Sequence, residues 1–306
     1  MIHMILNLLL PPFGALLVFF ILLPLRAIFK SLSFVWRSIF IENVKGKVVL
    51  ITGAASGIGE QLAYEYASRG ARLALVDIKE DNLRKVVERS TGLGSPHAVA
   101  IHGDVSKQDD CKRFIDHTIQ HFGQLNHLVC NAGFAKLLTT IPDVTDISSL
   151  NPVMDINFWG TVHSIHFAVP HLRQSRGKII VMASCNGWLP TAYTSIYNAS
   201  KAALIHLCET LRIEIGPDVG ITTVTPGLIK TEMTQGEYSA TVPVGRVLPS
   251  QSAENCAKAI FYGACRGDRY LAEPSWIGIT YLVAALCPEV VTWSCGLFYA
   301  WGSKQD

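Results

Sequence analysis

The stretch SIYNASKAAL places Tyr197 and Lys201 four residues apart, which puts both side chains on one face of a helix. A tyrosine whose pKa stays near its usual value, about 10, is a poor acid–base group at neutral pH. An ammonium one helical turn away favours the phenolate and brings the hydroxyl into the working range. The pair therefore indicates proton transfer by Tyr197, although Tyr-x-x-x-Lys taken alone is usually a solvated helix face.

Other residues near this pair are candidates for substrate contacts. Ser184 ends the stretch KIIVMAS, thirteen residues before Tyr197, and its hydroxyl can bond a carbonyl or alcohol. Asn157 lies inside a predicted helix, MDINFWG, where its amide can anchor a water. Trp188 and Tyr193 lie between Ser184 and Tyr197. They are predicted either to line a substrate pocket or to be ordinary core residues.

A glycine-rich turn precedes these residues. In VVLITGAASGIGEQLAYEYA, Gly53, Gly57 and Gly59 separate an apolar strand from a helix. Such a turn lets a pyrophosphate approach free N–H groups at the helix N-terminus. Asp77, eighteen residues beyond Gly59, can bond ribose hydroxyls and would repel a 2′-phosphate. NAD is therefore favoured as cofactor, while NADP stays possible because Lys79 follows two residues later.

The elements that must position these residues alternate along the chain. Short apolar strands are predicted at 47–53, 71–78, 97–105, 125–133, 177–184 and 220–227, and helices at 59–70, 81–90, 107–123, 154–174 and 195–215. This order predicts an α/β fold with a single Rossmann-type, doubly wound parallel sheet. The alternation fades after about residue 228.

The first 42 residues are predicted to be a lipid anchor. No charged side chain occurs from Met4 to Leu25, the prolines Pro11 and Pro12 interrupt this run, and Pro24 closes it. As a helix, the arm before Pro11 reaches only about 15 Å, half of a hydrocarbon core of about 30 Å. Two adjacent prolines lack N–H groups, so a turn there costs less in lipid. A hairpin is favoured over a kinked single span, and a cleaved signal peptide fits poorly.

The charges flanking the anchor predict its orientation. Arg26, Lys30 and Arg37 follow the apolar run, whereas His3 and the α-amino group precede it. This asymmetry places the catalytic domain on the cytosolic side of a lipid droplet or of the endoplasmic reticulum membrane. The predicted domains are the anchor at 1–42, a dinucleotide-binding domain at 43–270 and an apolar segment at 271–306.

The apolar C-terminal segment is predicted to cap the substrate pocket or to pack in a dimer. Its longest uncharged run, Pro274 to Pro288, has fifteen residues, short of the roughly twenty that a spanning helix needs. Contact of this segment with lipid stays possible.

Composition excludes other classes of function. A net charge of +2 gives no indication of a nucleic-acid partner. The eight cysteines show no zinc-ligand spacing, so no metal site is predicted. They are expected to be reduced and mostly buried, as in a cytosolic domain.

Taken together, these motifs resemble the short-chain dehydrogenase/reductase family over about residues 43–235. The resemblance implies hydride transfer between nicotinamide and a carbonyl or secondary alcohol carbon, and a dimer or tetramer. The residues that it implies for cofactor binding are Gly53, Ser56, Gly57, Ile58, Gly59, Asp77, Asp104, Val105, Asn131, Ala132, Gly133, Tyr197, Lys201, Pro226, Gly227 and Thr231.

The same resemblance implies a role for each catalytic residue. Tyr197 would be the acid/base, and Lys201 would lower its pKa and hold the nicotinamide ribose. Ser184 would position the reacting oxygen, and Asn157 would carry a proton-relay water. Thr231, in the stretch TEMTQGEYSATVPVGR expected to cover the pocket, would touch the nicotinamide amide.

The proline-interrupted N-terminus narrows the resemblance to the steroleosins, plant oil-body proteins also described as hydroxysteroid dehydrogenases resembling the 11-β type. This implies a membrane- or droplet-associated enzyme acting on a steroid-like alcohol or ketone. Two alternatives stay open. One is a reductase of another lipophilic carbonyl, such as a retinoid or fatty alcohol. The other is a sterol-binding droplet coat protein with little turnover.

Overall fold

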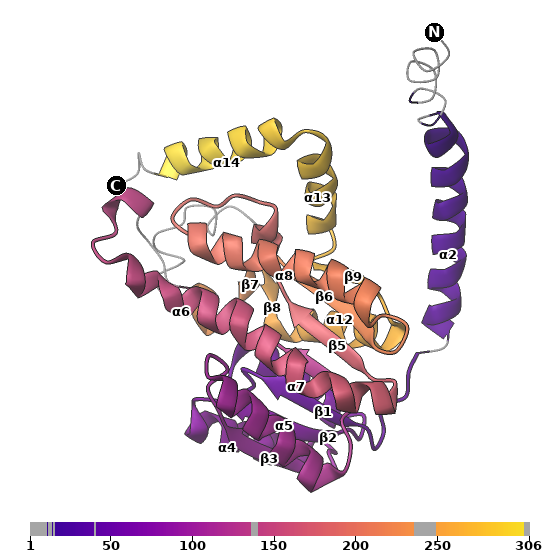
Figure 1. Ribbon diagram of the computed structural model, residues 1–306, viewed down its shortest axis with the longest axis vertical. Coiled ribbons are helices and arrows are strands. Elements are labelled where there is room, and N and C mark those ends of the chain that lie inside the picture. Colours follow the sequence, from indigo (N-terminus) through magenta and orange to yellow (C-terminus); the bar gives the residue numbers. More distant parts are fainter. Residues whose placement is uncertain are drawn as a thin grey trace. The chain divides into compact units, whose positions relative to one another are not determined.

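The computed structural model describes Pro11, Gly14 and residues 16–39, 41–135, 140–235 and 249–302 (Figure 1). Contacts divide the chain into two units, Met1–Glu42 and Asn43–Asp306. Within the second unit, the boundary predicted at residue 270 falls at the start of a strand of the main sheet, Tyr270–Glu273.

Seven strands of the described chain form one parallel sheet, in the order β3-β2-β1-β4-β5-β6-β9. Their bounds are β1 Val48–Thr52, β2 Arg72–Asp77, β3 Ala98–His102, β4 His127–Cys130, β5 Lys178–Met182, β6 Gly220–Pro226 and β9 Tyr270–Glu273. The first strand, β1, lies in the middle of the sheet. The strands β2 and β3 follow on one side of it, and β4 then pairs with β1 on its other side. The strand order therefore reverses between β1 and β4, where open α/β sheets bind their ligands. The predicted Rossmann-type sheet is confirmed.

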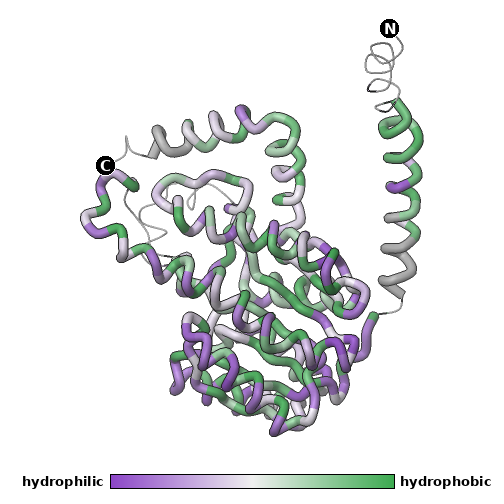
Figure 2. Tube along the Cα trace, in the orientation of Figure 1, coloured by the Kyte–Doolittle hydropathy of each residue, from purple (hydrophilic) through white to green (hydrophobic). Residues whose placement is uncertain are grey.

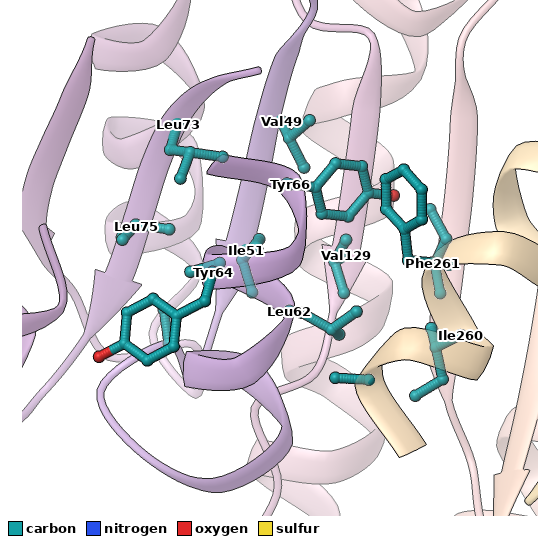
Figure 3. Close-up of a cluster of buried hydrophobic side chains, with 14 of the residues drawn as sticks. Val49, Ile51, Leu62, Tyr64, Tyr66, Leu73, Leu75, Val129, Ile260 and Phe261 are labelled. Carbon is teal, nitrogen blue, oxygen red and sulfur yellow. The ribbon is translucent and has the colours of Figure 1, made fainter. Parts of the chain in front are cut away.

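Helices cover both faces of the sheet (Figure 1). Alternate residues of β1 point to opposite sides: Val49 and Ile51 belong to one buried cluster, and Val48 and Leu50 to the other. The first cluster includes side chains of α3 (Gly57–Ala67), α4 (Glu80–Gly92) and α12 (Ala253–Arg266); Figure 3 shows part of it. The second includes α5 (Gln108–Phe122), α7 (Gly160–Ser175) and α8 (Ser195–Glu214). Burial on both faces explains why the strands are apolar throughout.

The six strands and five helices predicted from the sequence are all present. The helix predicted at 154–174 begins earlier and has three consecutive parts: α6 (Asn151–Met154), the π-helical η4 (Asp155–Trp159) and α7. Prediction missed α12 and β9. The helix α12 has the expected boundary signals, because the Ser252 hydroxyl accepts a hydrogen bond from the Asn255 N–H and Gly267 ends the helix with φ of 74°.

Shorter elements complete the second unit. They are the 3₁₀ turns η2 (Ile141–Asp143), η3 (Ile147–Leu150) and η5 (Cys185–Gly187), the paired strands β7 (Ile229–Lys230) and β8 (Gln251–Ser252), and the helices α9 (Glu232–Gln235), α13 (Ile277–Leu286) and α14 (Pro288–Gly302). The predicted apolar C-terminal segment thus contains α13 and α14.

The N-terminal unit contains a π-helical segment, η1 (Val18–Leu22), that continues directly into α2 (Leu23–Ile39). Pro24 lies inside this helix and does not end it. Proline lacks an N–H, and the neighbouring Leu23 N–H bonds to Val18 O in a π-helical pattern, so the helix continues through the proline. Apolar residues predominate along η1 (Figure 2).

Among the residues that the structure describes, no helix is both long and apolar enough to cross a membrane. Pro12 and the arm before Pro11 lie outside the described ranges, so the hairpin stays a prediction.

The cysteines agree with the sequence prediction. All eight lie in described ranges and are free thiols. Six are buried, Cys295 is half-buried, and Cys287, between α13 and α14, is exposed.

Candidate active site

Most of the predicted site residues follow the carboxyl ends of parallel strands. The glycine turn follows β1, Asp77 ends β2, Asn131 follows β4, Ser184 follows β5 and Pro226 ends β6. Because these strands are parallel neighbours, their ends lie along one edge of the sheet.

The turn after β1 has the conformation that an anion site needs. Gly53 and Gly57 have φ of 64° and 59°, a left-handed region that favours glycine. The helix α3 begins at Gly57, and its N-cap residue Ser56 makes no side-chain capping bond. The N-terminus of α3, including Ile58, therefore offers backbone N–H groups to a phosphate.

The turn after β4 holds the glycine turn in place. The Asn131 amide donates to Thr52 O at 3.0 Å and to Gly53 O at 2.9 Å. The Thr52 hydroxyl accepts the N–H groups of Asn131 and Ala132, both at 3.1 Å. Thr52 was not among the predicted site residues; its position directly before the first glycine was the available signal.

Gly59 packs against the turn with no room for a side chain, since an added Cβ would lie 2.1 Å from Gly53 O. We expect Gly59→Ala to lower the free energy of unfolding by about 1–3 kcal/mol, because backbone must move to relieve this overlap. Urea unfolding would measure the change. The matched control is Gly92→Ala at the end of α4, where an added Cβ meets nothing within 4 Å. Equal stability of the two variants would contradict the packing argument.

The carboxylate of Asp77 is fixed by two backbone donors. Its Oδ2 accepts the Ala55 N–H at 2.9 Å, and its Oδ1 accepts the Lys79 N–H at 2.9 Å. These bonds hold the carboxylate beside the glycine turn, where an adenosine ribose would lie if the pyrophosphate sits on α3.

Asp104 and Val105 follow β3 and shape a neighbouring turn. Asp104 Oδ1 accepts the N–H of Ser106 at 3.0 Å and its hydroxyl at 2.7 Å. Val105 is buried, and an added Cβ at Gly160 would lie 2.8 Å from its Cγ2. Asp104 thus supports the loop locally.

Lys201 lies deep in the site, with 4% of its surface exposed. Its Nζ donates to Met182 O at 2.8 Å and lies 5.5 Å from the centroid of the half-buried Tyr197 ring. Burial lowers the pKa of Lys201 to about 8. The lysine is therefore protonated at neutral pH and places a positive charge beside the tyrosine.

Ser184 is buried after β5 and starts the loop that leads to α8. Its Oγ donates to Pro226 O at 3.3 Å and accepts the Asn186 N–H at 3.2 Å. The Asn186 amide donates to Asn198 Oδ1 at 3.1 Å, which ties this loop to the helix that carries Tyr197. The serine and the tyrosine are thus held by one bonded network.

Asn157 is fully buried in the π-helical η4. Its Oδ1 accepts the Phe134 N–H at 2.7 Å, while its Nδ2 donates to Phe134 O at 2.9 Å and Ser200 Oγ at 3.0 Å. Both amide hydrogens are used, so only the second lone pair of Oδ1 is left to bind a water. A Cβ added at Gly133 would lie 3.5 Å from this oxygen and 3.7 Å from Lys201 Nζ, so both groups approach the same glycine.

Trp188 contacts the C-terminal helices. Its indole N–H donates to Thr280 Oγ1 at 2.9 Å, and its ring meets Tyr281 edge-on. It also lines a cavity of about 320 Å³, together with Asn186, Gly187, Pro190, Asn198, Ala199, Ala202, Ala284, Pro288, Val291 and Thr292. Helices α13 and α14 thus form one wall of a cavity next to the Ser184 loop. Tyr193, the other predicted pocket residue, has φ of 64°, a strained conformation for a residue other than glycine.

Gly227 and Thr231 connect this edge to the C-terminal part of the chain. The Gly227 N–H donates to Glu273 O at 2.7 Å. A Cβ added at Gly57 would lie 3.2 Å from Thr231 Cγ2, so Thr231 reaches the glycine turn. Of the predicted pocket cover at 231–246, residues 236–246 lie outside the described ranges.

Comparison with known proteins agrees with this geometry. The family described as short chain dehydrogenase matches residues 47–241. The chain is a short-chain dehydrogenase/reductase. It is therefore an NAD(P)-dependent oxidoreductase.

Curated relatives of this short-chain dehydrogenase/reductase include plant proteins. "11-beta-hydroxysteroid dehydrogenase 1A" of Arabidopsis thaliana is 50% identical over 296 residues, which cover 93% of this chain and 84% of the relative. "11-beta-hydroxysteroid dehydrogenase A" of Sesamum indicum is 46% identical over 315 residues, covering 98% and 88%. The chain thus belongs to the plant hydroxysteroid-dehydrogenase-like type.

A solved structure has the same fold. A short-chain dehydrogenase/reductase of Burkholderia phymatum, in complex with NAD, superposes with a TM-score of 0.74 at 24% identity and covers 81% of this chain and 96% of its own.

Three further contacts of this short-chain dehydrogenase/reductase were not predicted. Ser200 bonds Asn157, Met182 O bonds Lys201, and Glu232 pairs with Lys79 at 2.8 Å. Ser200 directly precedes Lys201, and that position was an available signal. The Met182 carbonyl belongs to the backbone, and such a group leaves no signal in the sequence.

Proposed function

We propose that this chain interconverts a secondary alcohol and a ketone on a steroid-like, lipophilic substrate, at the surface of a lipid droplet or of the endoplasmic reticulum membrane. The observation that carries the chemistry is the buried Lys201 ammonium beside Tyr197, at the edge of the sheet where the dinucleotide turn lies. The steroid-like substrate is supported by the names of the plant relatives.

Tyr197 is the acid/base in this proposal. In the oxidation direction its phenolate takes the proton of the alcohol, and in reduction its hydroxyl returns a proton to the carbonyl oxygen. Lys201 stabilises the phenolate by its charge. Ser184 holds the reacting oxygen. Its hydroxyl gives up the weak 3.3 Å hydrogen bond to Pro226 O and donates to the substrate oxygen instead. When bound, the nicotinamide cofactor accepts or supplies the hydride at the reacting carbon.

NAD is the favoured cofactor. The residues fit a dinucleotide, because the glycine turn has no room for side chains and α3 begins within it without a side-chain cap. Asp77 is held by two backbone N–H groups, so its carboxylate cannot easily turn away from a 2′-phosphate. Coulomb repulsion then disfavours NADP.

The outer surface of α13 and α14 supports contact with lipid. Ile279, Leu282 and Leu286 recur at helical spacing on α13, with 67%, 59% and 72% of their surfaces exposed. On α14, Val290 and Trp293 are 51% and 66% exposed. A lipid surface would cover this apolar face. The proposed N-terminal anchor would enter lipid as a hairpin, which would keep both of its ends on the cytosolic side.

The deciding experiment follows the absorbance of the reduced nicotinamide with the full chain in detergent micelles. Steroid and sterol alcohols, retinol and long-chain alcohols are each offered with NAD and with NADP. Turnover of a steroid alcohol with NAD is the expected result. Turnover confined to retinol or to fatty alcohols would favour the alternative substrate class. Cofactor binding without any turnover would favour a sterol-binding coat protein.

The proposed lipid association has a separate test. Full-length protein is mixed with oil droplets coated by a phospholipid monolayer and then centrifuged through a density gradient. Co-flotation that weakens when Ile279 and Leu286 are both replaced by serine is expected. Recovery of the wild type at the bottom would contradict it.

Size-exclusion chromatography with light scattering tests the dimer or tetramer that the family implies.

A further inference from the structure

An ion pair joins two distant parts of the chain beside the glycine turn. Lys79 Nζ lies 2.8 Å from Glu232 Oε2, although the two residues are 153 positions apart. Lys79 lies two residues after the end of β2, and Glu232 opens α9.

The contacts around this pair show where it lies. Asp77 accepts the Lys79 N–H with one carboxylate oxygen and the Ala55 N–H with the other. Thr231, next to Glu232, approaches Gly57 in the same turn. The ion pair thus connects the ribose-binding end of β2 to the segment that packs on the phosphate-binding turn.

The pair is easily exchanged for another partner. The side chains of Lys79 and Glu232 are 52% and 64% exposed, and ion pairs so open to water stabilise a fold by little. The hydrogen bond to Glu232 raises the pKa of Lys79, as expected for an ammonium that bonds a carboxylate. A competing anion could therefore bind Lys79 at small cost to the protein.

We propose that Glu232 helps to determine the choice of cofactor by occupying Lys79, a cation placed to bind the 2′-phosphate of NADP. This inference rests on the proposed binding of a dinucleotide at the glycine turn. Asp77 repels the phosphate directly, while Glu232 removes the group that would compensate for that repulsion. The two carboxylates act on the same phosphate by different routes.

The test measures binding rather than turnover. Dissociation constants of full-length protein for NAD and NADP, and for adenosine 5′-phosphate and adenosine 2′,5′-bisphosphate, are obtained by calorimetry. Glu232→Gln is expected to tighten binding of NADP and of the bisphosphate roughly tenfold, about what one charge-assisted hydrogen bond supplies. Binding of NAD and of the monophosphate is expected to stay within about twofold.

Two further variants separate a local effect from a general one. Asp116→Asn removes the same charge from α5, where Asp116 pairs with Lys112, and is expected to leave the ratio of the two affinities unchanged. Adding Lys79→Met to Glu232→Gln is expected to abolish the gain. A gain that survives this double change, or that Asp116→Asn reproduces, would overturn the proposal.

Two other outcomes distinguish this inference from the function on which it rests. If wild type binds NAD but Glu232→Gln leaves the ratio of the NAD and NADP affinities unchanged, the role assigned to Glu232 is wrong and the proposed function stands. If neither dinucleotide binds the wild type, both are wrong.

Discussion

Replacing Tyr197 by phenylalanine is expected to lower kcat by about 10²–10⁴-fold, the usual contribution of a positioned acid/base. The substitution keeps the ring that lies 5.5 Å from Lys201 Nζ and removes only the hydroxyl. Binding of the cofactor, which depends largely on the glycine turn and Asp77, should change little. The rate of nicotinamide reduction under saturating substrate measures the loss, and calorimetry with NAD checks the binding.

A second tyrosine provides the control for Tyr197→Phe. Tyr270 in β9 donates its hydroxyl to Glu209 Oε2 at 2.6 Å, on the protein surface. Tyr270→Phe should therefore leave kcat within about threefold, because no step of the reaction uses that hydroxyl. If Tyr197→Phe turned over like Tyr270→Phe, the acid/base assignment would be wrong. An unchanged biological effect of a Tyr197→Phe protein would instead favour the sterol-binding coat protein.

Lys201→Met is expected to lower kcat at least a hundredfold and at the same time to stabilise the fold at neutral pH. The activity falls because the positive charge beside Tyr197 is gone. The fold gains stability because burying an ammonium is costly, and burial has already lowered the pKa of Lys201 to about 8. A catalytic group that costs stability is a known consequence of selection for function.

The stability difference should depend on pH in a defined direction. Below pH 8 both the folded and the unfolded wild type carry a protonated Lys201, so the full cost of the buried charge is present. Between about pH 8 and the unfolded value near 10.5 the folded protein loses this proton first, so the cost is progressively relieved.

Urea unfolding of wild type and Lys201→Met across this range should show their difference shrinking as the pH rises. The control is Lys258→Met on the exposed side of α12, for which a constant difference is expected. A pH-independent difference in the free energy of unfolding between wild type and Lys201→Met would show that the buried charge of Lys201 is not the cause of that difference.

The sequence predicted the part of this protein whose signals are local. Six strands appear as short apolar runs because both faces of the sheet are covered, and the residues between them form motifs with fixed spacing. The strand β9 is a half-buried edge strand, so it lacks the apolar run that marks the other strands. The helix α12 buries Cys256, Ala257, Ile260, Phe261 and Ala264 at helical spacing and has capping signals at both ends, so its signal was present in the sequence and was missed. Partners that are distant in sequence were also beyond prediction, as the pairs Lys79–Glu232 and Asn157–Ser200 show.

The distribution of thiols gives the native chain a site for a fluorescent label. Burial raises the pKa of Cys111 and Cys185 to about 11 and that of Cys256 to about 12, so these thiols stay protonated and react slowly with maleimides. Cys287 is exposed between α13 and α14, the helices whose apolar face is proposed to meet lipid. A polarity-sensitive dye attached there would report, without any engineered cysteine, the moment at which the protein leaves water for an oil surface.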